Sequence, residues 1–203
     1  MPTGGTDPSG KDVIWLFDTT WKGIGKTRGH AAVIAGNEKY GWWYLSFSTG
    51  DNSLTSKDNA DVRHWVDFAD LMKCPQLKRY TRFAWYFTND EGRYQGTIRG
   101  VDYIKGFLKS YPSYEICEFN CLVASALAVR FCGFPINNPS KDEVWGELGE
   151  PPTWTDPNTH IKWVENYAKQ NPKKVVFGEW TKDLFTKKFP PTETQWIQSV
   201  NKK

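Results

Sequence analysis

Histidine and methionine are scarce in this chain of 203 residues, which contains three histidines and two methionines. Its four cysteines form no CxxC pair, and no nearby histidine or second cysteine pair completes the ligand set of a zinc site. Four cysteines at this length do not make a disulfide scaffold. The sequence therefore implies no metal and no cofactor, and it excludes the small disulfide-rich proteins.

Long apolar runs and a strong charge bias are also missing. No run approaches the roughly 20 residues that span a bilayer, so we expect no membrane insertion. The first residues, MPTGGTDPSGKD, lack the basic and apolar stretches of a secretory signal, which predicts synthesis in the cytoplasm without a signal peptide. With 26 basic and 23 acidic side chains the net charge is +3, and we expect no nucleic-acid partner.

A sizeable core is expected instead, because 39% of the residues are hydrophobic and 16% are aromatic. Apolar runs predict strands at 13–17, 30–35, 41–48, 82–88 and 174–177, with 30–48 forming a β-hairpin. Helical spacing predicts helices at 61–72, 97–108, 120–131, about 156–170 and 192–200. The pattern indicates an α+β fold, in which an antiparallel sheet packs on a central helix.

The helix at 120–131 carries a cysteine at its start. Asn120 is a good N-cap, Cys121 follows it, and Gly133 ends the helix. Free N–H groups and the helix dipole at that position favour a thiolate, and they can stabilise an oxyanion. A cysteine among alanine, valine and leucine is also a common small core residue, so the residues alone leave both roles open. The remaining cysteines have no comparable setting: Cys74, Cys117 and Cys132.

Three histidines compete for the role of a general base. His30 opens a predicted strand at the rim of a glycine-rich loop, whereas His64 lies among charged residues on a predicted helix. His160 falls in the first turn of another predicted helix, and it alone follows Cys121 in the chain. His30 and His160 are therefore the two candidates.

Two segments resemble the motifs of NlpC-type papain-like cysteine hydrolases. RGHAAVIAGNEKYGWWYLSFS is similar to their His-bearing hairpin, and EFNCLVASALAVRFCGF is similar to their Cys-bearing helix. The helix usually precedes the hairpin, but here it follows, which resembles the circularly permuted branch of the family. The resemblance covers roughly residues 13–134. It implies a permuted papain-like catalytic core at 1–134, with a C-terminal extension at 135–203 packed on the same domain.

The resemblance implies roles for individual residues. Cys121 matches the nucleophile and His30 the base, while His160 would be the base if the usual order held. The third position, which orients the imidazole, falls at Ser46. The family usually has His, Asn, Gln, Asp or Glu there, so serine is a departure.

Three further residues are expected to bind substrate. Asn120 is placed to help hold the oxyanion, although its capping role explains it equally well. Tyr44 shares a strand face with Ser46 by the two-residue period, and Trp43 presents its ring on the opposite face. Aromatic faces suit stacking on sugar rings or peptide edges, and they also suit an ordinary core.

The implied function is cleavage of amide bonds in bacterial peptidoglycan peptides. A wall-degrading enzyme made without a signal peptide resembles an interbacterial toxin such as a type VI secretion effector. Its implied partners are the secretion machinery and a cognate immunity protein, and it would act in the periplasm of a target bacterium. Two alternatives stay open. One is a deubiquitinase-like protease or lipid acyl hydrolase or transferase of the permuted branch, and the other is a non-catalytic, aromatic-rich wall-binding module.

Overall fold

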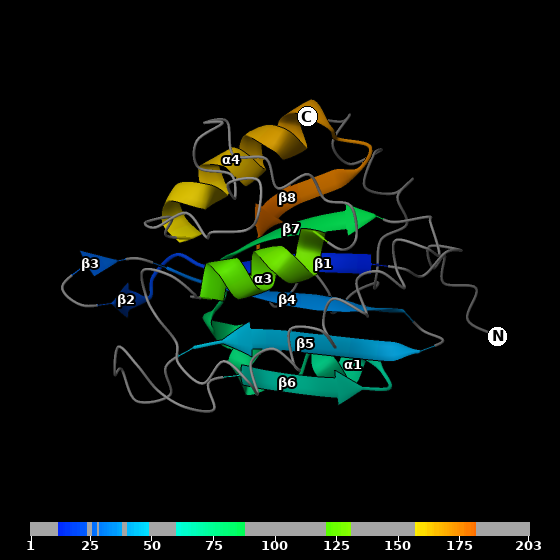
Figure 1. Ribbon diagram of the computed structural model, residues 1–203. Helices are drawn as coiled ribbons and strands as arrows, with labels where there is room; N and C mark the ends of the chain where they lie inside the picture. The colour runs from blue at the N-terminus through cyan, green and yellow to red at the C-terminus, as the bar shows by residue number, and fades with distance from the viewer. Residues whose placement is uncertain are drawn as a thin grey trace.

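The protein is a mixed α/β structure built on one six-stranded antiparallel sheet (Figure 1). The computed structural model describes residues 12–23, 26–27, 29–37, 40–48, 60–87, 121–130 and 157–181. The strand order is β6-β5-β4-β1-β7-β8. These strands are β1 (Asp12–Asp18), β4 (His30–Asn37), β5 (Gly41–Phe47), β6 (Ala60–Trp65), β7 (Arg82–Phe87) and β8 (Val175–Glu179). A small ribbon of β2 (Lys22–Gly23) and β3 (Lys26–Thr27) lies beside the sheet.

The predicted hairpin is confirmed, since β4 and β5 pair in antiparallel register from Ala32–Ser46 to Asn37–Gly41. Gly41 begins β5 with φ of +79°, a conformation that side chains with a Cβ rarely adopt. A Cβ there would also lie 2.5 Å from the carbonyl oxygen of Trp65. Glycine is therefore required where the hairpin meets β6.

The predicted helix at 61–72 is wrong in its first half. Residues 60–65 form the edge strand β6, which pairs with β5 along its whole length. Val62 packs toward one core cluster and Trp65 toward the other, which is the alternation of a strand. Only Phe68–Leu71 is helical (α1), and Asp67 caps it by accepting a hydrogen bond from the Ala69 N–H.

The helices predicted at 120–131 and 156–170 are confirmed as α3 (Cys121–Arg130) and α4 (Pro157–Gln170). The predicted helices at 97–108 and 192–200 lie outside the described residues. None of the helices among the described residues has the length and apolarity to cross a membrane.

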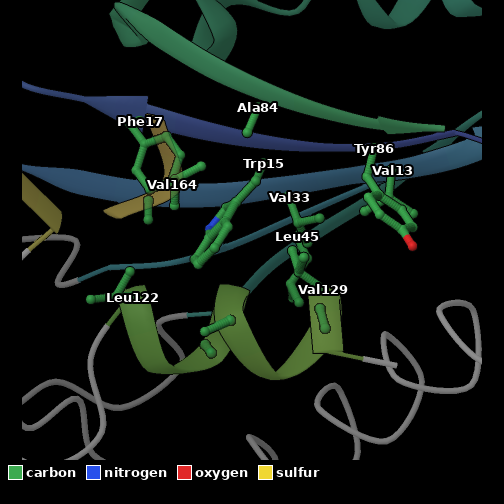
Figure 2. Packing of buried hydrophobic residues seen from close by; sticks show 14 of the residues in the cluster. Val13, Trp15, Phe17, Val33, Leu45, Ala84, Tyr86, Leu122, Val129 and Val164 are labelled. Carbon is green, nitrogen blue, oxygen red and sulfur yellow. The ribbon is translucent and has the colours of Figure 1, made fainter. Parts of the chain in front are cut away.

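Each face of the sheet carries its own core. Helices α3 and α4 cover the face that we call the front, formed by Val13, Trp15 and Phe17 of β1 with alternate residues of the other strands. Figure 2 shows these side chains pointing from the sheet toward α3. Helix α1 and the 3₁₀ turn η1 (Pro75–Arg79) cover the back, where Ile14 and Leu16 lie.

Small residues bring α3 close to the sheet. Ala124 and Ala128 of the helix and Ala31 and Ala35 of β4 all belong to the front cluster. Alanine side chains on both surfaces allow a close approach of helix and strands. The N-terminal end of α3 lies toward Phe17, and its C-terminal end toward Val13 (Figure 2).

Candidate functional site

Cys121 is the first residue of α3, as the sequence predicts. Its side chain is 2% exposed and belongs to the front cluster. The first turn of α3 contains no acidic residue, so no carboxylate there competes for the positive end of the helix dipole. Asn120, expected to bind the oxyanion, lies outside the described residues.

His30 lies on the back of the sheet. Its side chain is on the same face of β4 as those of Ala32 and Ile34, which belong to the back cluster. Its ring stacks on Tyr80 at a centroid distance of 6.1 Å. Its Nε2 atom is 2.9 Å from the Ser46 Oγ atom. The structure therefore brings together His30 and Ser46, the two residues expected to form the base and its orienter.

The structure does not bring His30 to Cys121. Ala31 and Val33, the odd-numbered neighbours of His30 on β4, are the residues that face α3. The imidazole of His30 points the other way, into the layer of α1 and η1, so the sheet itself separates it from the thiol. Two-residue periodicity along a strand is the physical reason that His30 and Cys121 lie on opposite faces.

The surroundings of His30 form a buried polar cluster. Burial, with a smaller contribution from the positive charge of Arg79, lowers the pKa of His30 to about 3. The hydroxyl groups of Tyr44 and Tyr80 lie 2.7 Å apart in the same region, and burial raises the pKa of both phenols. His30 is therefore neutral at physiological pH, in a cluster whose polar groups satisfy one another.

Arg79 also ties this cluster to the end of β1. Its Nε atom donates to Asp18 Oδ2 at 3.1 Å, and Asp18 Oδ1 accepts from the backbone N–H groups of Thr20 and Trp21. The Thr20 hydroxyl donates to the same oxygen at 2.7 Å. These bonds fix the turn that leaves β1, and they pair the charge of Arg79 with that of Asp18.

His160 lies on the same side of the sheet as Cys121. It falls in the first turn of α4, is 7% exposed, and its ring lies 5.2 Å from that of Trp15 in the front cluster. Burial lowers the pKa of His160 to about 4. Within the described part of the chain, its Nε2 atom is buried without a hydrogen-bond partner. His160 is thus a neutral imidazole whose Nε2 atom is left without a partner by the described residues.

Trp15 connects the helix of Cys121 to His160. Its indole N–H donates to Ser125 Oγ at 2.9 Å, and the Ser125 hydroxyl donates to the Leu122 carbonyl at 3.1 Å. Ser125 is four residues after Cys121, so the two side chains share one side of α3. Trp15 therefore contacts both helices: its indole N–H bonds to Ser125 of α3, and its ring contacts the imidazole of His160 on α4.

The aromatic residues expected to bind substrate lie away from Cys121. Tyr44 is buried on the back, where it belongs to the polar cluster. Trp43 packs on the front, but it pairs with Ala35, whose other strand partner, Val13, lies toward the C-terminal end of α3 (Figure 2). Its ring contacts His64 at 4.5 Å, and His64 is exposed on β6 rather than on a helix. Neither residue lines the first turn of α3.

Sequence reasoning missed Trp15 and Ser125. They are 110 positions apart, and no local motif links a strand tryptophan to a helix serine. The alternation of 13–17 would have placed Trp15 on one face with Val13 and Phe17, but not which helix covers that face. No group of three or more His, Cys, Asp or Glu side chains among the described residues is arranged to hold a metal ion.

No protein-family model and no curated protein sequence matches the chain. Among solved structures it is similar to the crystal structure of the type VI secretion system effector TseH. The TM-score is 0.47 with 16% sequence identity, over 83% of this chain and 98% of that chain. A likeness at this level carries no information on activity or catalytic residues.

Proposed function

We propose that the chain is a cysteine hydrolase of amide bonds, in which Cys121 is the nucleophile and His160 its general base. The observation that carries the proposal is the placement of two groups on one face of the sheet. One is a thiol at the start of α3, and the other is a buried, neutral imidazole whose Nε2 atom has no partner among the described residues. A neutral imidazole can accept the proton of a thiol, and the helix N-terminus favours the resulting thiolate.

The steps of the reaction are those of an acyl transfer to water. Cys121 Sγ attacks the carbonyl carbon of the amide, and the thiol proton passes to His160. His160 then protonates the leaving amine as the C–N bond breaks, which leaves a thioester on Cys121. Water attacks the thioester with His160 taking its proton, and the products are a carboxylic acid and the free thiol.

The proposed substrate class is the peptide part of bacterial peptidoglycan, as the sequence resemblance implies. Purified full-length protein would be incubated with isolated cell-wall sacculi, and the soluble products identified by mass spectrometry. We expect fragments with a new amine and a new carboxyl end from the wild type and none from Cys121→Ala. Intact sacculi with the wild type, or equal products from both proteins, would refute the activity on this substrate.

We also propose that the protein acts as an interbacterial toxin, delivered by a secretion machinery and neutralised in its producer by an immunity protein. Expression in a bacterium with an added periplasmic signal tests this role. We expect lysis with the periplasmic wild type, and survival with its cytoplasmic form or with periplasmic Cys121→Ala. A harmless periplasmic wild type, or an equally toxic variant, would contradict the role.

A further inference from the structure

His160 contacts two indole rings. Its ring centroid lies 5.2 Å from that of Trp15 at an interplanar angle of 58°, and 5.2 Å from that of Trp163 at 42°. Trp163 is three residues further along α4 and stacks in turn on Tyr167 at 5.7 Å. In the described residues the imidazole is thus held by ring contacts, while its buried Nε2 atom has no hydrogen-bond partner.

Both indoles are themselves fixed. Trp15 is 1% exposed in the middle of the front cluster, and its N–H is bonded to Ser125 on α3. Trp163 packs against the same cluster from α4. An imidazole in contact with two such rings has little freedom to rotate, because side chains in a close-packed interior occupy defined rotamers.

The two rings also suit the charged form of His160. An aromatic ring attracts a cation held over its face within about 6 Å of the centroid. Both indole centroids lie inside that distance of the imidazole, in tilted arrangements. Burial alone disfavours an imidazolium, yet the reaction proposed above forms one after the thiol gives up its proton. Some group must compensate that cost, and no carboxylate is shown beside His160 in the described part of the chain.

We infer that Trp15 and Trp163 are positioning residues that replace the polar third residue of a cysteine-hydrolase site. They hold the imidazole of His160 on the face of the sheet that α3 covers, and their rings stabilise its protonated form. The inference rests on the proposed function. It also explains why the serine at position 46 is not needed to orient the catalytic imidazole. Ser46 contacts His30 on the back of the sheet, whereas Cys121 and His160 are on the front.

Alkylation of Cys121 by iodoacetamide, followed by peptide mapping in the full-length protein, tests this role. At pH 6 a thiolate forms mainly through the ion pair with an imidazole, whereas at about pH 9.5 a thiol ionises without one. We expect Trp163→Leu to slow alkylation at pH 6 by about tenfold, because misplacing a reacting group is costly, with little change at high pH. Trp163→Phe keeps a ring face and should restore most of the rate.

The controls separate this inference from the proposal on which it rests. Trp42→Leu removes a buried indole on the back of the sheet, so it should lower stability without changing the pH dependence. His160→Gln removes the proposed base, so it gives the alkylation rate of Cys121 in the absence of that base. If His160→Gln alkylates like the wild type at pH 6, the proposed base is refuted. If His160→Gln is slow but Trp163→Leu is not, or if Trp163→Phe is as slow as Trp163→Leu at every pH, only the role of the indoles is refuted.

Discussion

The His30 Nε2 atom lies 2.9 Å from the Ser46 Oγ atom, on the face of the sheet opposite to Cys121. This contact joins two residues that the sequence pattern had paired, but it places them in the layer of α1 and η1. A motif can therefore predict which side chains meet across a hairpin without predicting which layer they enter. Of the two buried histidines among the described residues, His160 is the one on the face of Cys121.

Two buried, neutral histidines should make the protein acid-sensitive. The pKa values of His30 and His160 are lowered to about 3 and about 4, below the ordinary 6.5. The unfolded chain therefore binds more protons below pH 6.5, and the stability present above that pH is lost as the pH falls toward the folded pKa values. Between neutral pH and pH 5, each histidine should therefore lower the free energy of unfolding by about 2 kcal/mol.

Urea unfolding at pH 7 and pH 5 measures this effect. The wild type should lose roughly 4 kcal/mol between the two pH values, from two histidines at about 1.4 kcal/mol per pKa unit. His30→Gln, which cannot titrate, should lose about half as much by the same relation. An equal loss in the wild type and the variant would show that His30 is not held neutral by the fold.

Ser46 should matter for stability and not for catalysis. Ser46→Ala leaves the buried Nε2 atom of His30 without its hydroxyl partner, which should cost about 1–3 kcal/mol. Ser48→Ala makes the same chemical change at a half-buried position just after β5, and it should cost under about 0.5 kcal/mol. Activity per folded molecule should be unchanged in both variants, and a selective loss of activity in Ser46→Ala would restore its predicted catalytic role.

The close approach of α3 to the sheet should not tolerate larger side chains. Ala128 is fully buried against the front cluster, so Ala128→Leu should lower the unfolding free energy by about 1–3 kcal/mol through overpacking. Arg130→Ala, at an exposed position of the same helix, serves as the control. A negligible cost for Ala128→Leu in thermal or urea unfolding would mean that α3 does not pack on the sheet as described.

The tyrosine pair should show energetic coupling. Tyr44→Phe and Tyr80→Phe each remove one hydroxyl from a buried contact of 2.7 Å. Each single variant leaves the other hydroxyl short of a partner, whereas the double variant removes both, so the double cost should be smaller than the sum. A double-mutant cycle by urea unfolding should give a coupling of about 0.5–3 kcal/mol. Strict additivity would argue against the contact.

Much of the fold could be predicted from local pattern. The apolar runs at 13–17 and 30–35 are β1 and β4, and the capped, alanine-rich segment is α3. The error at 61–72 arose because apolar residues at helical spacing there also alternate between the two faces of an edge strand. Pairing with β5 supplies the backbone hydrogen bonds that decide in favour of the strand.

The site was less predictable for a different reason. The position of Cys121 at a helix start is a local property, and the sequence indicates it directly. Two features decide which histidine is on the face of Cys121. One is which face of β4 α3 covers, and the other is where α4 packs. Both are set by contacts between residues distant in sequence. The alternation of 13–17 indicates the face of Trp15, but its contacts with Ser125 and His160 have no local signal.

The assignment of His160 as the base of Cys121 is tested most directly by comparing two histidine variants on cell-wall sacculi, the proposed substrate. His160→Gln and His30→Gln would be matched for folded protein by circular dichroism, and initial rates of product release measured at pH 7. We expect His160→Gln to lose at least about 100-fold in rate, the usual contribution of a general base, and His30→Gln to stay close to the wild type. The reverse result, with His30→Gln inactive and His160→Gln active, would contradict the account and restore the pair that the sequence motif predicts.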